Sequence, residues 1–264
     1  MQFVRPKKSF GQHFLKNKTI ANRISQGIDT SICSRVLEIG PGMGILTAEL
    51  LKLPIQLKVI EIDRESVQYL KDNALVPEEH IIEGDFLRAP IHDFFEGQEF
   101  SIAGNFPYNI SSQIVFKAIE NRAYVPQLTG MFQREMARRI CSPKGSKEYG
   151  IISVLTQAFY DVTYNFTVHE QEFNPPPKVK SGVITLTRKT NQTLPCNESL
   201  FFTVVKAGFN QRRKTLDNSL KKLLNGIKLH NNFGSLRPEQ LDVFEFIEIT
   251  NYVESQQKGG SNAI

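Results

Sequence analysis

The tetrapeptide Asn105-Phe106-Pro107-Tyr108 combines groups that could hold an aromatic amine for alkylation. Such a nitrogen is a poor nucleophile because its lone pair is delocalised into the ring. The side-chain oxygen of Asn105 and the carbonyl of Phe106 could each accept one amine hydrogen and draw the nitrogen towards tetrahedral geometry, with no strong general base needed. Pro107 stiffens the turn, and Tyr108 offers a stacking face for a base swung out of its helix. An ordinary turn could have the same four residues, but the position of the segment after the fourth expected strand favours an aromatic amine, such as that of adenine, positioned to attack a methyl sulfonium.

A glycine-rich turn, Gly40-Pro41-Gly42-Met43-Gly44, follows a short apolar run and is preceded by Glu38. Glycines allow the backbone to approach a ligand closely. The spacing G-x-G-x-G differs from the G-x-G-x-x-G of dinucleotide sites, where pyrophosphate lies on a helix N-terminus. S-adenosylmethionine has no phosphate but has an ammonium group, which an acid such as Glu38 could face. We expect Gly40 and Gly42 to contact this cofactor.

Two further acids follow later strands of the expected sheet. Glu61 ends the second strand, where a carboxylate can accept both ribose hydroxyls. Asp85 follows the third strand and could accept from an adenine amine, with Phe86 beside the ring. Since doubly wound sheets bind ligands at the carboxyl ends of their strands, these positions together favour S-adenosylmethionine.

Alternating strand and helix patterns predict the framework that would position these residues. Strand patterns cover residues 35–39, 57–62, 80–83, 100–104 and 127–132, and helical patterns cover 45–53, 64–74, 110–121 and 149–159. Such alternation predicts a doubly wound, Rossmann-like α/β domain with a parallel sheet. Residues 162–168 and 183–187, on either side of three prolines, could form a closing antiparallel pair.

Strand patterns stop near Thr190, and the polar stretch 190–197 is typical of a linker. Beyond it, residues 200–209, 215–224 and 243–254 have helical patterns. We therefore expect a catalytic domain over residues 1–190 that binds S-adenosylmethionine, and a small helical domain over 191–264 that contacts RNA or the ribosome.

The net charge of +5 is concentrated in two stretches. Residues 1–23 contain six basic side chains and no acid, and residues 206–228 contain seven basic side chains and one acid. Segregated positive charge favours a polyanionic partner, although a solvated helix surface would have the same pattern. No apolar run reaches the roughly 18 residues that a membrane helix needs, and three scattered cysteines suggest neither a metal nor a disulfide site. We expect a cytoplasmic monomer without a metal.

Six segments together resemble the small-subunit ribosomal RNA adenine N6,N6-dimethyltransferases of the KsgA type, relatives of the erythromycin-resistance rRNA methyltransferases. The similarity runs from Lys8 to about Asn251. It rests on the following residues: 10–15 (FGQHFL), the glycine turn, 59–63 (VIEID), 105–111 (NFPYNIS), 173–181 (FNPPPKVKS) and 209–216 (FNQRRKTL).

The resemblance implies that His13 and Leu15 join Gly40, Glu61, Asp85 and Asn105 around S-adenosylmethionine, and that Phe173 stacks on the target base opposite Tyr108. His13 stands where the family commonly has Asn, and Phe106 where it usually has Leu. The implied substrate is a pair of adjacent adenosines in the hairpin near the 3′ end of small-subunit rRNA, dimethylated at N6 with four cofactor molecules. The expected RNA contacts are Arg212, Arg213, Lys214, Lys221 and Lys222.

Other functions stay open at this point. A DNA adenine methyltransferase could use the same acceptors, but such enzymes more often have Asp at the Asn105 position and need a larger target-reading domain. A ribosome-assembly factor that has lost catalysis is the alternative from a different class. A dehydrogenase is disfavoured by the glycine spacing.

Overall fold

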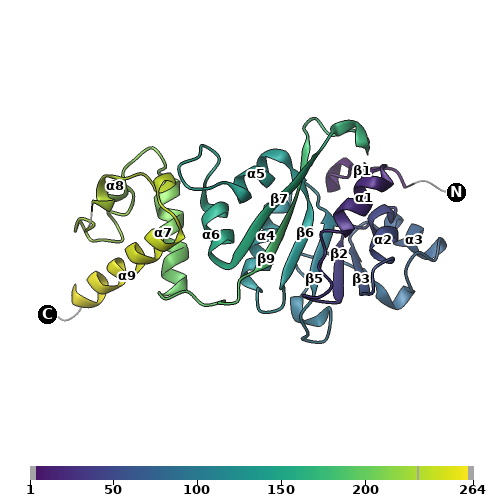
Figure 1. Ribbon diagram of the computed structural model, residues 1–264, viewed down its shortest axis with the longest axis horizontal. Helices are drawn as coiled ribbons and strands as arrows, with labels where there is room; N and C mark the ends of the chain where they lie inside the picture. Colours follow the sequence, from purple (N-terminus) through teal and green to yellow (C-terminus); the bar gives the residue numbers. More distant parts are fainter. Residues whose placement is uncertain (1–3, 231, 261–264) are drawn as a thin grey trace. The chain divides into compact units, whose positions relative to one another are not determined.

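The computed structural model describes residues 4–230 and 232–260, and a seven-stranded sheet forms the centre of its first compact unit (Figure 1). The strand order is β4-β3-β2-β5-β6-β9-β7. Strands β2 to β6 pair in parallel, and β9 runs antiparallel to β6. This arrangement confirms the predicted doubly wound α/β fold. The strands are β2 (Arg35–Ile39), β3 (Gln56–Glu61), β4 (Ile81–Glu83), β5 (Ser101–Asn105), β6 (Gln127–Gln133), β7 (Tyr160–Val168) and β9 (Ser181–Arg188).

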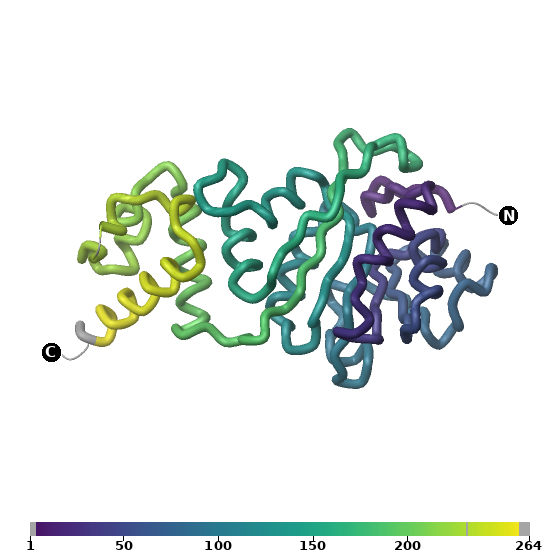
Figure 2. The backbone as a smooth tube through the Cα atoms, viewed as in Figure 1, coloured from purple at the N-terminus to yellow at the C-terminus, as the bar shows by residue number. Residues whose placement is uncertain are grey.

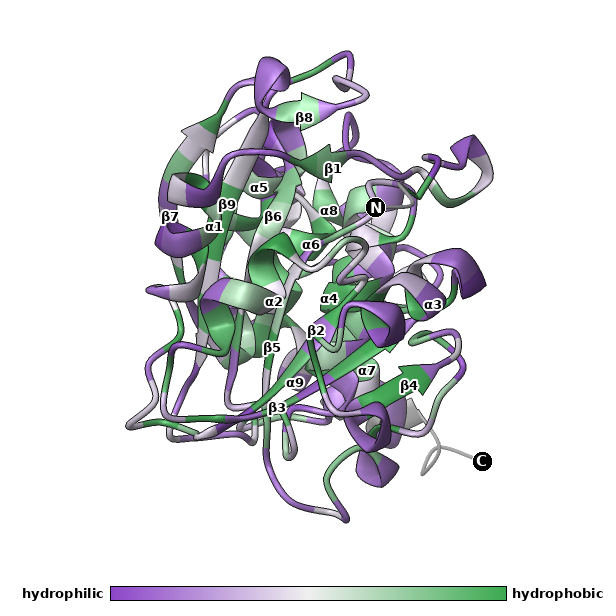
Figure 3. Ribbon diagram, turned by 90° about the vertical axis from the view of Figure 1, so that its right-hand side faces the viewer, coloured by the Kyte–Doolittle hydropathy of each residue, from purple (hydrophilic) through white to green (hydrophobic). Residues whose placement is uncertain are grey.

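Helices cover both faces of this sheet (Figure 2). On one face, α1 (Lys18–Ser25), α2 (Ile45–Leu50) and α3 (Arg64–Asp72) bury Ile24, Leu50 and Leu70 in a core shared with the strands. On the other face lies α4 (Ser111–Glu120), whose Ile114 and Ile119 are fully buried. In Figure 3 the central strands are mostly hydrophobic, whereas α3 is mostly hydrophilic and buries only one side, with Val67 and Leu70.

Local sequence explains where these helices begin. Asn17 precedes α1, and its side chain accepts from the amides of Thr19 and Ile20. Asp63 precedes α3 and accepts from the amide of Glu65. Both are N-caps of the usual type. Helix α1, helix α5 (Arg134–Cys141) and a short two-stranded sheet of β1 (Phe14–Leu15) and β8 (Phe173–Asn174) are not among the elements expected from the sequence.

The second compact unit is helical and consists of Arg139–Tyr160 and the described residues from Lys189 onward. Its helices are α6 (Ile151–Phe159), α7 (Glu198–Asn210), α8 (Leu216–Ser219) and α9 (Val243–Gly260). Helix α8 is shorter than the predicted 215–224, because the chain continues from it in turns.

Short 3₁₀ helices occur in both units: η1 (Lys8–Phe10), η2 (Glu78–His80), η3 (Ile91–Asp93), η4 (Glu170–Glu172), η5 (Phe233–Ser235) and η6 (Pro238–Gln240).

This unit contains a segment, Arg139–Tyr160, that the expected domain boundary at residue 190 assigns to the first domain. Helix α6 belongs with the C-terminal helices, since the buried Tyr149 just before it packs edge-on against Phe209 of α7, with 6.1 Å between ring centroids. Sequence alternation alone assigns this helix to the α/β domain. None of the described helices is both long enough and apolar enough to cross a bilayer.

Candidate active site

The carboxyl ends of the parallel strands meet at one edge of the sheet and border a single cavity. Residues from the N-terminal segment and from the loops after β2, β3, β4 and β5 line it. Of the expected site residues, the structure brings together at this cavity His13, Gly40, Gly42, Glu61, Asp85, Phe86, Asn105, Phe106, Pro107 and Tyr108. Leu15 and Phe173 are not among the lining residues.

The glycine turn lies against the carboxylate of Glu61. Gly40 and Gly42 have φ values of +68° and +55°, which L side chains rarely adopt, and a Cβ on Gly42 would come within 2.8 Å of the Phe14 ring. The Glu61 side chain accepts from the amides of Gly42, Ile62 and Asp63, at 3.2, 2.9 and 2.9 Å. Burial raises the pKa of Glu61, and these three amides oppose that shift. The carboxylate is therefore held rigidly at the cavity wall.

Glu38 is placed differently from the expectation that it faces an ammonium group. Its side chain is 1 % exposed and lies beneath the turn, where it accepts from the Thr47 hydroxyl at 2.6 Å. Burial raises the pKa of Glu38 to about 8, and the nearby Glu61 adds to the shift. Burial thus favours the neutral form of Glu38, and the side chain binds Thr47 of α2 rather than facing a ligand.

Asp85 and Phe86 form the opposite wall of the cavity. The Asp85 carboxylate accepts from the amide of Leu87 at 2.9 Å and lies 3.5 Å from Nε of the exposed Arg88; it is about one-third exposed, so it keeps acceptor capacity for a ligand. Phe86 is almost fully buried and stacks on Phe94 with 6.0 Å between ring centroids. Ile62, which directly follows Glu61, lines the same cavity with 47 % of its surface exposed. An aromatic ring system would fit between such apolar surfaces.

Asn105 ends β5 with its side chain already oriented. Its Nδ2 donates to the carbonyl of His13 at 2.9 Å, which leaves Oδ1 as the free acceptor. None of the described residues donates to the Phe106 carbonyl, whereas the Phe106 amide donates to Met131. Two acceptors on adjacent residues are therefore available for the two hydrogens of one amine.

The side chain of Phe106 explains why this backbone is fixed. Its ring is 1 % exposed and lies over Gly104 and Gly130, where added Cβ atoms would collide with ring carbons. It also meets Phe132 edge-on at 5.0 Å. The ring thus anchors the turn, a role that adds to the predicted role of its carbonyl.

Tyr108 has its hydroxyl and one ring face already in contact. The hydroxyl lies 2.7 Å from the Oγ of the buried Ser181, at the start of β9. The ring of His13 stacks on the Tyr108 ring with 5.7 Å between the two centroids. Burial raises the pKa of Tyr108, although the hydrogen bond with Ser181 opposes the shift. Nδ1 of His13 lies 2.8 Å from the Pro175 carbonyl, to which it donates, so Nε2 is the ring nitrogen left for a ligand.

Phe173 lies in the hydrophobic core, away from the cavity. Its side chain is 1 % exposed and belongs to the same core cluster as Leu15, which it opposes across the β8–β1 ladder. In this packing neither face of the ring is available to a base. The expected stacking of Phe173, and a side-chain contact of Leu15 with the cofactor, are therefore not supported by this arrangement.

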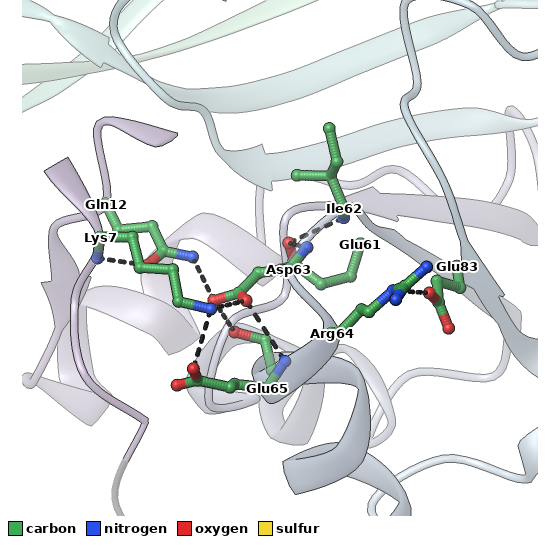
Figure 4. A network of polar contacts seen from close by, with 9 residues as sticks. Lys7, Gln12, Glu61, Ile62, Asp63, Arg64, Glu65 and Glu83 are labelled. Carbon is green, nitrogen blue, oxygen red and sulfur yellow. Dashed lines mark hydrogen bonds and ion pairs between the residues drawn. The ribbon is translucent and has the colours of Figure 1, made fainter. Parts of the chain in front are cut away.

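The N-terminal segment is tied to the site by a polar cluster that the sequence does not reveal (Figure 4). Lys7 donates to Asp63 and pairs with Glu65 at 3.1 Å, and Gln12 donates to Asp63 at 3.0 Å. Although burial opposes it, these bonds hold the pKa of Asp63 below its usual range. The capping position of Asp63 before a helical pattern is the only sequence signal for this role.

The expected RNA-contacting residues lie in the second unit. Arg213, Lys214, Lys221 and Lys222 are exposed, and no described side chain pairs with them. Arg212 is only partly exposed and is engaged, because it donates to the Lys147 carbonyl at 2.8 Å and lies 3.8 Å from Glu239. The side chain of Arg212 therefore braces the loop before α6.

The donor set at the cavity suits S-adenosylmethionine. Glu61 and Asp85 offer carboxylates at separate positions, Ile62 and Phe86 offer apolar surface between them, and Gly40 and Gly84 leave room, since a Cβ on either would meet nothing within 4 Å. No group of three or more His, Cys, Asp or Glu among the described residues could hold a metal ion.

Comparison with protein families and relatives extends this result to the whole chain. The model of the family described as ribosomal RNA adenine dimethylase matches residues 4–249. A relative from Flavobacterium johnsoniae, named ribosomal RNA small subunit methyltransferase A, is 55% identical over 256 residues, which are 97% of this chain and 98% of the relative. A relative of the same name from Bacteroides thetaiotaomicron is 52% identical over 260 residues, covering 98% of this chain and 97% of the relative.

Two solved structures share the fold and part of the sequence. A dimethyladenosine transferase from Plasmodium falciparum is 28% identical with a TM-score of 0.75, and the match covers 94% of this chain and 98% of that one. The 23S rRNA methyltransferase ErmE is 27% identical with a TM-score of 0.64, covering 89% of this chain and 99% of that one.

Proposed function

Because this chain belongs to the ribosomal RNA adenine dimethylase family, we propose that it uses S-adenosylmethionine to dimethylate adenosine at N6 in 16S rRNA. The observation that carries the proposal is the pair of free acceptors at Asn105 Oδ1 and the Phe106 carbonyl, on residues that line a cavity suited to the cofactor. Its substrate would be two adjacent adenosines of the hairpin near the 3′ end of that rRNA.

The cofactor would supply a methyl group on a sulfonium. In the proposed binding mode, Glu61 accepts from the ribose hydroxyls, Asp85 accepts from the adenine amine, and Ile62 and Phe86 pack against the adenine. The glycine turn and His13 would contact the amino-acid end. Each contact uses a group that the fold already holds in place, so little ordering would be needed on binding.

Asn105 and Phe106 would act on the target amine. Accepting both hydrogens makes the nitrogen more nucleophilic and aims its lone pair, and the rate gain comes from positioning and electrostatics. The proton would leave after methyl transfer, so no strong base is required. After one methylation a single hydrogen remains on the nitrogen, and either acceptor could hold it, which is compatible with a second transfer.

The target adenosine would have to leave its stack to reach this edge of the sheet. Tyr108 would then support the base through the ring face that His13 does not cover. The exposed basic residues of the second unit would bind rRNA phosphates, which contribute affinity and salt dependence rather than chemistry. Acting on a ribosomal subunit, the protein would work in the cytoplasm, as a monomer, and would have a role in small-subunit biogenesis.

Methyl transfer from labelled S-adenosylmethionine tests this proposal on three substrates: undermethylated small ribosomal subunits, naked 16S rRNA and duplex DNA. We expect transfer to the subunits, with four methyl groups at saturation, located near the 3′ end by mass spectrometry. Transfer mainly to DNA would support a DNA methyltransferase instead. Tight subunit binding without any transfer would support an assembly factor that has lost catalysis.

A further inference from the structure

Lys117 of α4 holds the loop that follows β4. Its Nζ lies 2.7, 3.0 and 2.6 Å from the carbonyl oxygens of Phe86, Leu87 and Ala89. An ammonium group has three N–H donors, so all of them are used within this loop and none is left for a ligand. The same nitrogen lies 5.0 Å from the centroid of the Phe86 ring, within the range of a cation–π contact.

The loop that Lys117 holds is the proposed adenine subsite. Asp85 begins it, and the Asp85 carboxylate accepts from the amide of Leu87, whose carbonyl is one of the three acceptors of Lys117. Arg88 and Ala89 close the turn by donating their amides to the Asp85 carbonyl. The direction of the carboxylate therefore depends on a short loop whose carbonyls converge on one ammonium group.

We propose that Lys117 is a positioning residue for the adenosine end of the cofactor, and that it fixes the loop 85–89 so that Asp85 recognises the adenine amine. This inference rests on the proposed function of the cavity. Lys117 also links the two parts of the site, because α4 begins directly after the catalytic segment that contains Asn105 and Tyr108. Burial lowers the pKa of Lys117, while Asp85 opposes the shift, in accord with an ammonium enclosed by the loop.

Lys58 provides a matched control in the same unit. Its Nζ donates to the Phe94 carbonyl at 2.8 Å and lies 5.1 Å from the Phe95 ring, so it combines the same two kinds of contact. Lys58 and Lys117 are both partly buried, but Lys58 bonds no residue of the loop 85–89 and does not line the cavity. Lys58→Met therefore removes a comparable structural lysine that bonds no residue of the adenine subsite and reaches it only indirectly, through Phe94, which stacks on Phe86.

The test measures binding of two ligands by calorimetry: S-adenosylhomocysteine and S-inosylhomocysteine, in which a carbonyl oxygen replaces the adenine amine. The unsubstituted protein should prefer the adenosyl ligand by about tenfold or more, because the inosyl oxygen cannot donate to Asp85. Lys117→Met should reduce this preference to about twofold or less and weaken S-adenosylhomocysteine roughly tenfold. Lys58→Met should keep the preference.

Lys117→Arg keeps the charge and covers the case in which Lys117→Met does not fold. A planar guanidinium cannot direct three donors at converging carbonyls as an ammonium does, so the preference should still fall by at least about threefold. A full preference in either folded Lys117 variant would overturn the inference while leaving the proposed function intact. A lack of preference in the unsubstituted protein would instead remove the adenine role of Asp85, and the role of Lys117 with it.

Discussion

The cavity edge of the first unit and the basic segment 212–222 of the second unit, called the basic turn below, use polar side chains in opposite ways. At the cavity edge, Glu61, Asn105 and Tyr108 line the cavity, and the side chain of each has a defined partner. In the basic turn, Arg213 and Lys214 are exposed and have no partner among the described side chains. Bond formation requires positions fixed within fractions of an ångström, whereas attraction of a polyanion requires mainly charge.

Substitutions in the two regions should differ in the size of their effects and in how those effects depend on salt. Substitutions at the cavity edge should have large effects that salt does not change, because the groups are buried and their interactions are short. Substitutions in the basic turn should have small, additive effects that disappear in high salt. The variants below test the contrast from the largest expected effect to the smallest.

Asn105→Ala should have the largest effect on activity. Losing one of the two acceptors should lower single-turnover methyl transfer to small subunits by about 10²–10³-fold, the range seen when one preorganised polar group is removed from an active site. The affinities for S-adenosylhomocysteine and for the subunit should change by less than about threefold, and the rate defect should be equal in low and high salt. A rate within tenfold of the unsubstituted enzyme would contradict the proposed role of Asn105.

Glu38→Gln should alter the pH dependence of stability. The folded-state pKa of Glu38, about 8, lies above the ordinary value of 4.5, so its stabilising contribution is complete below pH 4.5 and is lost as the pH rises towards 8. Within that window each pH unit costs about 1.4 kcal/mol, so the protein should lose roughly 2–3 kcal/mol between pH 5 and pH 7 that Glu38→Gln does not lose. Urea unfolding of both proteins measures this difference, and parallel pH curves would contradict it.

Much of this site can be predicted from the sequence because its signals are local. Glycines that need positive φ, an acid at the end of an apolar strand and an Asn-x-Pro-Tyr turn are all readable within a few residues. Parallel pairing then places their carboxyl ends at one edge, so that Gly42, Glu61 and Asn105 meet without any knowledge of side-chain contacts.

The features that the sequence does not reveal depend on long-range packing. Ser181 meets Tyr108 across 73 residues, and Lys117 reaches a loop about 30 residues earlier. The resemblance implies that Phe173 stacks on the target base, whereas its side chain lies in the core beside the β8–β1 pairing. From the sequence we expect Glu38 to face the ligand. Side chains along a strand alternate between the two faces of the sheet, but this alternation does not tell which face a helix covers.

Tyr108 and Ser181 should behave as one unit. Tyr108→Ala removes the stacking face and should lower methyl transfer by about 10–100-fold, as expected for the loss of roughly 1–3 kcal/mol of stacking. Tyr108→Phe and Ser181→Ala each remove only the shared hydrogen bond and should lower the rate about threefold. Because both lose the same bond, the double variant Tyr108→Phe/Ser181→Ala should be no slower than either single variant. Multiplying defects would show that Ser181 acts independently of Tyr108.

The charges of the basic turn should be interchangeable. Replacing Arg213, Lys214, Lys221 and Lys222 together by Ala should weaken subunit binding and reduce the slope of log affinity against log salt by about 0.7–0.9 for each phosphate that the protein no longer neutralises. The single-turnover rate at saturating subunit should stay unchanged, because no cavity residue is altered. An unchanged salt slope would remove these four residues as the RNA-binding surface.

Arg212 and its neighbour Arg213 should have different roles: Arg212 stabilises the fold, and Arg213 contributes only charge for binding. Arg212 donates to the carbonyl of Lys147 and lies near Glu239, so Arg212→Ala should lower the free energy of unfolding by about 1–2 kcal/mol. Arg213 is exposed, so Arg213→Ala should leave unfolding unchanged within about 0.5 kcal/mol and weaken subunit binding by only a few-fold. Urea unfolding and salt-dependent binding measured on both variants decide between the two roles. If both substitutions changed the free energy of unfolding equally, Arg212 would have no structural role of its own. All the basic residues of this segment would then serve only to bind RNA, unlike the side chains at the cavity edge.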